Sequence, residues 1–213
     1  MPTRTVFCED AQTFLQRDFD NQLSIITSLP NVTETTFEFE NWKRWFVQTA
    51  ALCMTRADPN GAAIFFNSDS RVDGTTFSKC ELLFEASRIA KVKLVWHKIV
   101  ARHKRISATS LFRPSYWHYL AFSQQAHCGR VTTDIFYEGP RLWRYGLGLD
   151  AVCAAVEFCR NAGMKGIIDP TCGTGIVLAV ANAYGLDAIG NEILPERVEQ
   201  ARTLTIPGIG KHR

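Results

Sequence analysis

The sequence lacks several patterns that would place it in a specialised class of protein. No apolar run approaches the ~20 residues of a membrane-spanning helix, and the first residues, MPTRTVFCED, contain no apolar stretch typical of a secretion signal. The seven cysteines include no CxxC pair, so buried thiols in a reducing compartment explain them better than disulfides or zinc. We therefore expect an intracellular protein, cytoplasmic or nuclear, with neither a membrane nor a metal partner.

Internal repeats and low-complexity tracts are also missing, and 213 residues are enough for one domain with a substantial core. Strand-like segments alternate with helix-like ones along the chain. The continuous apolar runs LSIIT and GAAIFFN, for example, flank a stretch with apolar residues at helical spacing. Such alternation predicts an α/β fold with a doubly wound, mostly parallel sheet. The aromatic segment SYWHYLAFSQ follows its neighbouring strand through a loop, so it can pair antiparallel.

Acidic residues are absent from one segment. Between Arg88 and Arg113 there are eight lysines or arginines and no aspartate or glutamate, whereas the rest of the chain carries 16 basic and 21 acidic residues. A basic segment in an otherwise mildly acidic chain is typical of a local site for an anionic partner. A solvated basic face is the alternative.

A full GxGxxG dinucleotide motif is missing, but a shorter glycine turn is present in DPTCGTG. Gly173 and Gly175 stand where a strand turns into a helix, so the backbone can approach a ligand closely. Asp169 precedes them, and Glu192 ends the next strand, where a carboxylate can accept hydrogen bonds from ribose hydroxyls. An acid before the glycines suits a cationic ligand, such as the sulfonium and ammonium groups of S-adenosylmethionine, better than pyrophosphate. An ordinary tight turn is the alternative.

The stretch IIDPTCGTGIVLAVANAYGLDAIGNEI resembles the cofactor motif of class I S-adenosylmethionine-dependent methyltransferases. It is most similar to the version in the DNA amino-methyltransferases, which modify adenine or cytosine. LSIITSLPN resembles the catalytic strand and tetrapeptide of that group, and it precedes the cofactor motif, as in the circularly permuted classes. The resemblance implies a seven-stranded sheet of order 3-2-1-4-5-7-6.

The resemblance covers most of the chain and implies a single permuted methyltransferase domain, residues 1–213. Residues 1–125 would supply the third strand, the catalytic loop and the substrate half. Residues 126–147 carry weak signals and are interpreted as a linker, and residues 148–213 would form the cofactor-binding half.

The resemblance also implies a set of residues for S-adenosylmethionine. Glu192 would hold the ribose, Asp10 would contact the adenine amine, and Ala11 would lie against the adenine ring. For Asp10, a helix cap is the alternative. The methionine part would be lined by Asp169, Thr171, Gly173 and Gly175.

The predicted catalytic tetrapeptide is Ser28, Leu29, Pro30 and Asn31. In the family, the first side chain and the next carbonyl accept hydrogen bonds from an exocyclic amine, and an aromatic fourth residue stacks on the base. Here Leu29 replaces a proline and Asn31 replaces the ring, which Tyr116, Trp117 or Phe112 could supply unless they only pack. Glu34 is a candidate proton acceptor, with a solvated loop acid as the alternative.

The basic segment corresponds to the sixth strand and the loop leading to the seventh, at the edge of the implied substrate cleft. This predicts a nucleic-acid substrate. We expect RNA ahead of DNA, because the chain has no room for a separate target-recognition domain, and a protein partner could supply specificity. A methyltransferase of small molecules or proteins, and a cofactor-binding but inactive subunit, remain the alternatives. The predicted substrate contacts are Lys98, Arg102, Lys104, Arg105, Arg113, Tyr116 and Trp117.

Overall fold

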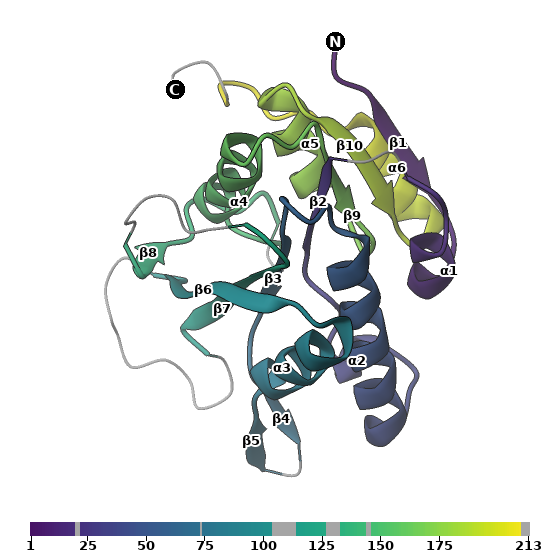
Figure 1. Ribbon diagram of the computed structural model, residues 1–213, viewed down its shortest axis with the longest axis vertical. Helices are drawn as coiled ribbons and strands as arrows, with labels where there is room; N and C mark the ends of the chain where they lie inside the picture. Colours follow the sequence, from purple (N-terminus) through teal and green to yellow (C-terminus); the bar gives the residue numbers. More distant parts are fainter. Residues whose placement is uncertain (20–21, 73, 104–113, 127–132, 144–145, 210–213) are drawn as a thin grey trace.

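The sheet places the late glycine turn at the centre of the molecule. The computed structural model describes residues 1–19, 22–72, 74–103, 114–126, 133–143 and 146–209. Its main sheet has eight strands in the order β1-β10-β9-β2-β3-β7-β6-β8 (Figure 1). The strands are β1 (Arg4–Phe7), β10 (Asp187–Asn191), β9 (Gly166–Asp169), β2 (Leu23–Thr27), β3 (Ala63–Asn67), β7 (Tyr116–Ser123), β6 (Lys93–Ala101) and β8 (Ile135–Tyr137).

The first seven of these strands confirm the predicted order 3-2-1-4-5-7-6. From β1 to β3 all neighbours are parallel, whereas β7 is antiparallel to both β3 and β6. β8 is an addition. It pairs parallel with β6, so residues 126–147 contribute an edge strand as well as connecting segments.

Helices cover both faces of the sheet (Figure 1). One face packs against α4 (Leu149–Asn161), α5 (Ile176–Ala183) and α6 (Pro195–Thr203). The other packs against α1 (Ala11–Leu15), α2 (Phe39–Arg56) and α3 (Lys79–Ala90). A short 3-10 helix, η1 (Val32–Glu34), precedes α2, and β4 (Ser70–Val72) and β5 (Thr75–Phe77) form a separate hairpin before α3.

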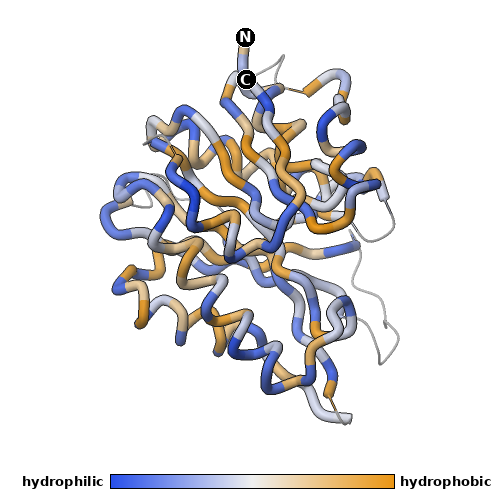
Figure 2. The backbone as a smooth tube through the Cα atoms, turned by 90° about the vertical axis from the view of Figure 1, so that its right-hand side faces the viewer, coloured by the Kyte–Doolittle hydropathy of each residue, from blue (hydrophilic) through white to orange (hydrophobic). Residues whose placement is uncertain are grey.

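This two-sided covering explains the apolar runs in the sequence. Every residue of β2, β3 and β9 is buried, as expected for parallel strands with helices on both faces. α2 instead buries one stripe that includes Trp42, Phe46 and Ala50. The hydropathy colouring agrees, because the central strands are mostly hydrophobic and the helices alternate in character (Figure 2).

The edge strand β1 is held by residues from the far end of the sequence. Arg4 Nη1 donates to the carbonyl oxygens of Ala201, at 3.0 Å, and Leu204, at 2.6 Å. The Thr3 amide donates to Asp187 Oδ1 at 2.6 Å. These bonds fix β1 against β10 and α6. Among the described helices, none combines the length and the apolar character needed to cross a membrane.

Candidate active site

A crevice is expected where the connections of two neighbouring strands diverge. β9 and β2 are adjacent and parallel, but the helix after β9 (α5) and the helix after β2 (α2) cover opposite faces of the sheet. Ligands of open α/β sheets bind outside the carboxyl ends of strands at such a switch point. Asp169 ends β9 and Ser28 directly follows β2, so the predicted cofactor turn and catalytic loop meet at this point.

Hydrogen bonds connect the two strand ends. The Thr27 hydroxyl donates to Asp169 Oδ1 at 2.8 Å and lies 2.8 Å from the Thr171 hydroxyl. Thr171 in turn donates to the Ser28 carbonyl oxygen at 3.3 Å. Thr27 is fully buried, and its only sequence signal is its position next to Ser28. Through Thr27 and Thr171, the predicted cofactor and acceptor residues are connected by hydrogen bonds.

Asp169 is the buried charge of this unit. The side chain is 3% exposed, and burial raises the pKa of its carboxyl to about 7, with the Glu192 charge acting in the same direction. The bonds from Thr27 and from the Thr171 amide, the latter at 3.2 Å, oppose this rise. A positive group in the crevice would favour the carboxylate form. The site is therefore suited electrostatically to a cation.

Glu192 fixes the glycine turn. Its Oε2 accepts from the Gly173 amide at 3.0 Å, and its Oε1 accepts from the Leu194 amide at 3.1 Å. Each carboxylate oxygen keeps a free lone-pair direction for hydroxyl groups of a ligand. The next residue, Ile193, is an exposed apolar side chain, 65% accessible.

The two glycines of the turn have different reasons to be glycine. Both have positive φ, +54° at Gly173 and +90° at Gly175. A Cβ on Gly173 would meet nothing within 4 Å, whereas a Cβ on Gly175 would lie 2.7 Å from Ala201 Cα. Gly173 therefore leaves space on its open side, and Gly175 permits the close packing of α5 on α6.

This difference predicts that Gly175→Ala destabilises the protein more than Gly173→Ala does. Left-handed backbone strain costs each variant about 1–2 kcal/mol, and overpacking against α6 costs Gly175→Ala a further ~1–3 kcal/mol. Denaturant unfolding of the two variants measures the difference in unfolding free energy. Equal losses would contradict the packing role of Gly175.

Asp10 caps α1 in this structure. Its Oδ1 accepts from the Gln12 amide at 2.9 Å and the Thr13 amide at 3.1 Å. Ala11 is the first residue of this helix and is buried. These contacts match the helix-cap alternative, and contact of Asp10 and Ala11 with an adenine ring stays a prediction.

The loop after β2 leaves Ser28 available. In the described part of the chain, the Ser28 hydroxyl makes no hydrogen bond. Leu29 is buried, and the Pro30 carbonyl accepts from Nε1 of the buried Trp42 at 3.1 Å. Trp42 thus holds the loop through the Pro30 carbonyl, while the Ser28 hydroxyl stays free to accept a hydrogen bond.

Asn31 and Glu34 have structural partners. Glu34 Oε2 accepts from the Asn31 amide at 2.8 Å and so closes η1 on itself. The Asn31 side chain accepts from Lys79 Nζ at 2.6 Å and from the Ser70 hydroxyl at 3.2 Å. Asn31 therefore joins the loop to the β4–β5 hairpin and to α3.

Lys79 is a candidate functional residue that no sequence pattern indicates. It begins α3, is only 1% exposed, and directs its ammonium group to the loop through Asn31. Burial lowers its pKa to about 8, and the Glu34 and Asp69 charges oppose this change. Burying a cation costs free energy. We therefore infer that Lys79 has a role in positioning Asn31.

The predicted substrate residues are not all brought together. Lys98 is 7% exposed and donates to the Thr133 carbonyl oxygen at 2.8 Å, so its ammonium group is occupied within the fold. The Arg102 guanidinium lies 4.6 Å from the centre of the Trp117 ring. Lys104, Arg105, Phe112 and Arg113 lie outside the described residues.

Tyr116 and Trp117 are adjacent in β7, so their side chains point to opposite faces of the sheet. The Tyr116 hydroxyl donates to Asp69 Oδ2 at 3.2 Å, close to the hairpin that contacts Asn31. Trp117 Nε1 instead donates to Glu138 Oε2 at 2.9 Å. Of the two rings, Tyr116 is the one on the side of the predicted catalytic loop.

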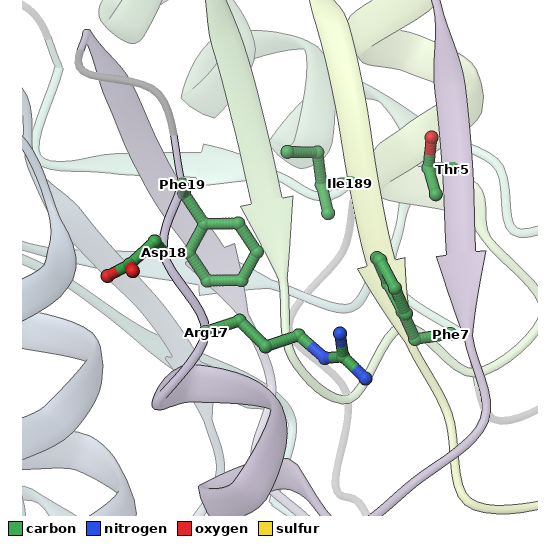
Figure 3. A pocket seen from close by; sticks show the side chains of 6 residues that line it. All are labelled: Thr5, Phe7, Arg17, Asp18, Phe19 and Ile189. Atoms are coloured by element: carbon green, nitrogen blue, oxygen red, sulfur yellow. The ribbon is translucent and has the colours of Figure 1, made fainter.

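A separate pocket of about 320 Å³ lies over β1 and β10 (Figure 3). The Arg17 guanidinium lies 4.6 Å from the centre of the Phe7 ring and pairs with Glu9 at 2.6 Å. No predicted site residue lines this pocket, so we do not assign it to the active site. Its lining residues are Thr5, Phe7, Arg17, Asp18, Phe19 and Ile189.

Comparison with known proteins identifies the fold. No protein-family model and no curated protein sequence matches the chain. Among solved structures, TTHA0409 of Thermus thermophilus, assigned as a DNA modification methylase, has 16% identity and a TM-score of 0.73, over 98% of this chain and 97% of that one. The cytosine-N4-specific PvuII DNA methyltransferase has 13% identity and a TM-score of 0.70, over 97% and 88%. M1.HpyAVI has 14% identity and a TM-score of 0.62, over 94% and 97%.

The predicted resemblance to the DNA amino-methyltransferases is thus confirmed at the level of the fold. At 13–16% identity, this likeness shows the fold alone.

Proposed function

We propose that the protein is an S-adenosylmethionine-dependent methyltransferase that acts on an exocyclic amine of a base in DNA. The observation that carries this proposal is the switch point between β9 and β2, where Thr27 and Thr171 connect buried Asp169 to the backbone carbonyl of Ser28, whose own hydroxyl stays free. TTHA0409 and M1.HpyAVI, which share the fold, have been solved in complex with S-adenosylmethionine. This supports the choice of cofactor.

The residues of the glycine turn fit that cofactor chemically. The Asp169 carboxylate suits the positive methionine end, and Glu192 keeps acceptor directions for the ribose hydroxyls. Gly173 allows close backbone approach, and Asp10 and Ala11 would lie toward the adenine. When bound, the cofactor supplies a methyl group activated by the sulfonium.

Ser28 and the Leu29 carbonyl would orient the acceptor. Both can accept hydrogen bonds from an exocyclic amine, which directs the nitrogen lone pair toward the cofactor side of the crevice. No strong base is needed, because positioning supplies most of the acceleration for an activated donor. Tyr116 is our candidate for the ring that Asn31 does not provide, since base–aromatic stacking contributes about 1–3 kcal/mol.

DNA replaces RNA as the proposed nucleic acid. The RNA preference rested on chain length, and the comparisons do not support it, because the solved structures with this fold are described as DNA methylases. Arg102 and, on sequence grounds, Lys104, Arg105 and Arg113 would contact phosphates. We omit Lys98, whose ammonium group donates to the Thr133 carbonyl oxygen.

We also interpret the chain order as a circular permutation, since β9 and β10 follow β7 in the chain but lie between β1 and β2 in the sheet.

One observation favours a second candidate function. The fourth tetrapeptide residue is Asn31, so the loop offers no stacking ring of its own. The Asn31 side-chain oxygen accepts hydrogen bonds from Lys79 and Ser70. This favours a small-molecule or protein acceptor. Transfer of labelled methyl groups from the cofactor to separated DNA, RNA, protein and metabolite fractions decides between them. Label in DNA supports our proposal, whereas label confined to another fraction, or none with the cofactor bound, contradicts it.

Ser28→Ala is expected to slow methyl transfer about 5- to 150-fold, because it removes a positioning hydrogen bond of ~1–3 kcal/mol. Cofactor affinity should stay unchanged, since this hydroxyl faces the acceptor. Single-turnover rates and calorimetric cofactor titrations separate the two effects. Thr55→Ala, which removes an exposed hydroxyl at the end of α2, is the control. A Ser28→Ala enzyme with the parent's rate would show that the acceptor lies elsewhere.

A further inference from the structure

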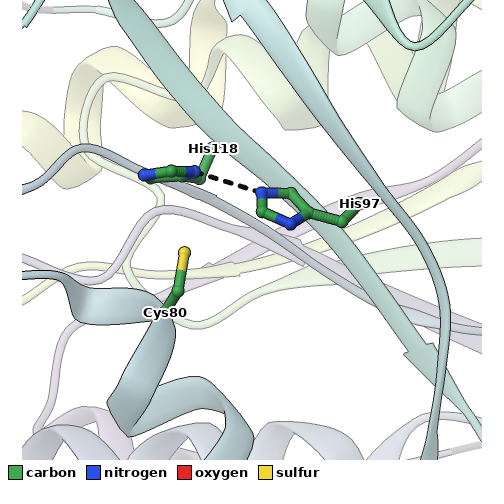
Figure 4. Close-up of side chains that lie close together, drawn as sticks. All are labelled: Cys80, His97 and His118. Carbon is green, nitrogen blue, oxygen red and sulfur yellow. Dashed lines mark hydrogen bonds between the residues drawn. The ribbon is translucent and has the colours of Figure 1, made fainter.

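Three side chains with metal-binding chemistry converge beside the predicted catalytic loop. Cys80 of α3, His97 of β6 and His118 of β7 each place a ligand atom within 4.8 Å of the other two. The Cys80 sulfur points toward the two imidazole rings (Figure 4). No CxxC or paired-histidine spacing in the sequence announces this cluster, because its members come from three different elements.

The fold determines why the two histidines meet. In the antiparallel β6–β7 ladder, His97 pairs with Leu120 and Ile99 pairs with His118. Both histidines therefore lie on one face of the sheet in a diagonal relation, within reach of each other. That face is the one covered by α3, whose first turn carries Cys80.

The spacing of the two imidazole nitrogens fits a tetrahedral centre. His97 Nε2 and His118 Nδ1 lie 3.1 Å apart. Two imidazole nitrogens bound to Zn²⁺ at ~2.0–2.1 Å with a tetrahedral angle are separated by about 3.3 Å. The two nitrogens would need little movement to bind one ion, and the Cys80 sulfur lies within 4.8 Å of both. Cys80 is buried while His97 is exposed, so one side of the cluster is open to water.

An outer carboxylate orients His118. Its Nε2 lies 3.1 Å from Asp69 Oδ1, and Asp69 is itself held by the Ser78 hydroxyl at 2.8 Å and the Tyr116 hydroxyl at 3.2 Å. With the ring proton on Nε2 toward Asp69, the neutral imidazole presents the lone pair of Nδ1 to the cluster. Histidine ligands of zinc usually have such a carboxylate partner.

A further polar group lies on the same face. Asn67 is directly opposite His118 in the β3–β7 ladder. Its side-chain nitrogen and oxygen are buried and have no hydrogen-bond partner in the described residues. A metal-bound water would offer this amide a partner, which the described residues do not.

We propose that Cys80 Sγ, His97 Nε2 and His118 Nδ1 bind one Zn²⁺ ion, with water at the fourth position. Zn²⁺ is the ion that suits one thiolate and two imidazoles in tetrahedral geometry. The ion would clamp the start of α3 to β6 and β7. Lys79 precedes Cys80, and Ser70 follows Asp69, so the clamp would hold both partners of Asn31. The competing explanation is a metal-free hydrogen-bonded chain through Asp69, His118 and His97.

Metal titration of the full-length, chelator-treated protein under reducing conditions tests this proposal without any assay of methyl transfer. Zn²⁺ in competition with a chromophoric chelator should bind one equivalent. Co²⁺ should give thiolate charge-transfer absorption and the intense visible bands of a tetrahedral centre. Cys80→Ser and His97→Gln should each weaken Zn²⁺ binding at least ~100-fold, while Asp69→Asn should weaken it about 10- to 100-fold.

Matched controls are Cys8→Ser and His103→Gln, which alter an exposed cysteine and an exposed histidine outside the cluster and should leave the affinity unchanged. Less than stoichiometric binding would overturn the proposal, as would Zn²⁺ binding that survives both ligand substitutions or an octahedral Co²⁺ spectrum. Because binding is measured directly, a failed zinc site and a failed methyltransferase assignment remain distinguishable.

Discussion

Replacement of Asp169 by asparagine is expected to reduce the affinity for S-adenosylmethionine about 30-fold or more. Asparagine keeps the size of the side chain and an oxygen for the Thr27 hydroxyl, but it removes the buried negative charge. Loss of one partner from a buried, hydrogen-bonded charge pair costs ~2–5 kcal/mol. Calorimetric titration at pH 8 measures the change, and Asp187→Asn is the control for loss of an acid outside the crevice.

The same residue predicts a pH dependence with a definite sign. The pKa of Asp169 is about 7, and a cationic ligand binds the carboxylate form. Affinity of the parent should therefore rise with pH through 7 and level off above it, with a limiting slope of ~10-fold per pH unit below. Asp169→Asn should remove this dependence. A pH-independent parent, or an asparagine variant that binds as tightly, would contradict the cationic-ligand site.

Asp169 also affects stability. Its pKa in the folded protein is raised, so between about pH 4 and 7 the folded state binds more protons than the unfolded state. The contribution of this group to the unfolding free energy therefore decreases as pH rises through that window. An unfavourable buried carboxylate at neutral pH is a cost that a bound cation would offset.

Lys79→Met is expected to separate stability from activity. Methionine fills a similar volume but leaves Asn31 without its charge-assisted bond. If that bond of ~1.5–3 kcal/mol holds the loop in its catalytic position, turnover should fall about 10- to 150-fold while cofactor affinity stays constant.

Stability should move the other way. Burial lowers the pKa of Lys79 from 10.5 to about 8, which corresponds to a cost of about 3 kcal/mol at neutral pH. This cost is fully present below pH 8 and disappears as pH rises toward 10.5. The methionine variant avoids it, so its unfolding free energy at pH 7 should equal or exceed the parent's. Lys165→Met, at an exposed lysine, is the control. Lower stability together with normal turnover would make Lys79 a purely structural residue.

The resemblance to the DNA amino-methyltransferases predicted the strand order, and the sequence patterns located individual strands and their ends. Buried parallel strands appear as continuous apolar runs, and an acid at the end of such a run, as at Asp169, marks the carboxyl edge. β8 was not predicted, because three residues at an exposed edge carry almost no pattern.

Residues that act through distant partners could not be predicted in this way. Thr27, Lys79 and the Cys80–His97–His118 cluster are defined by contacts between elements, and neither local spacing nor residue type reveals them. The surroundings of Lys98, a predicted substrate contact, could not be predicted for the same reason. A lysine in a basic segment suggests an exposed cation, but its ammonium group donates to the Thr133 carbonyl oxygen, 35 positions away.

The position of β9 and β10 has a consequence for how the chain folds. During synthesis, β1 and β2 emerge early, but the two strands that lie between them are made only with residues 166–191. Until then β1 has no neighbour in the sheet, and β2 can pair only with β3. The pairing of Arg4 with Ala188 is among the most non-local contacts that the chain can form, and such contacts slow folding. The nascent protein must therefore keep two unpaired strand edges from associating with other chains until its central strands are complete.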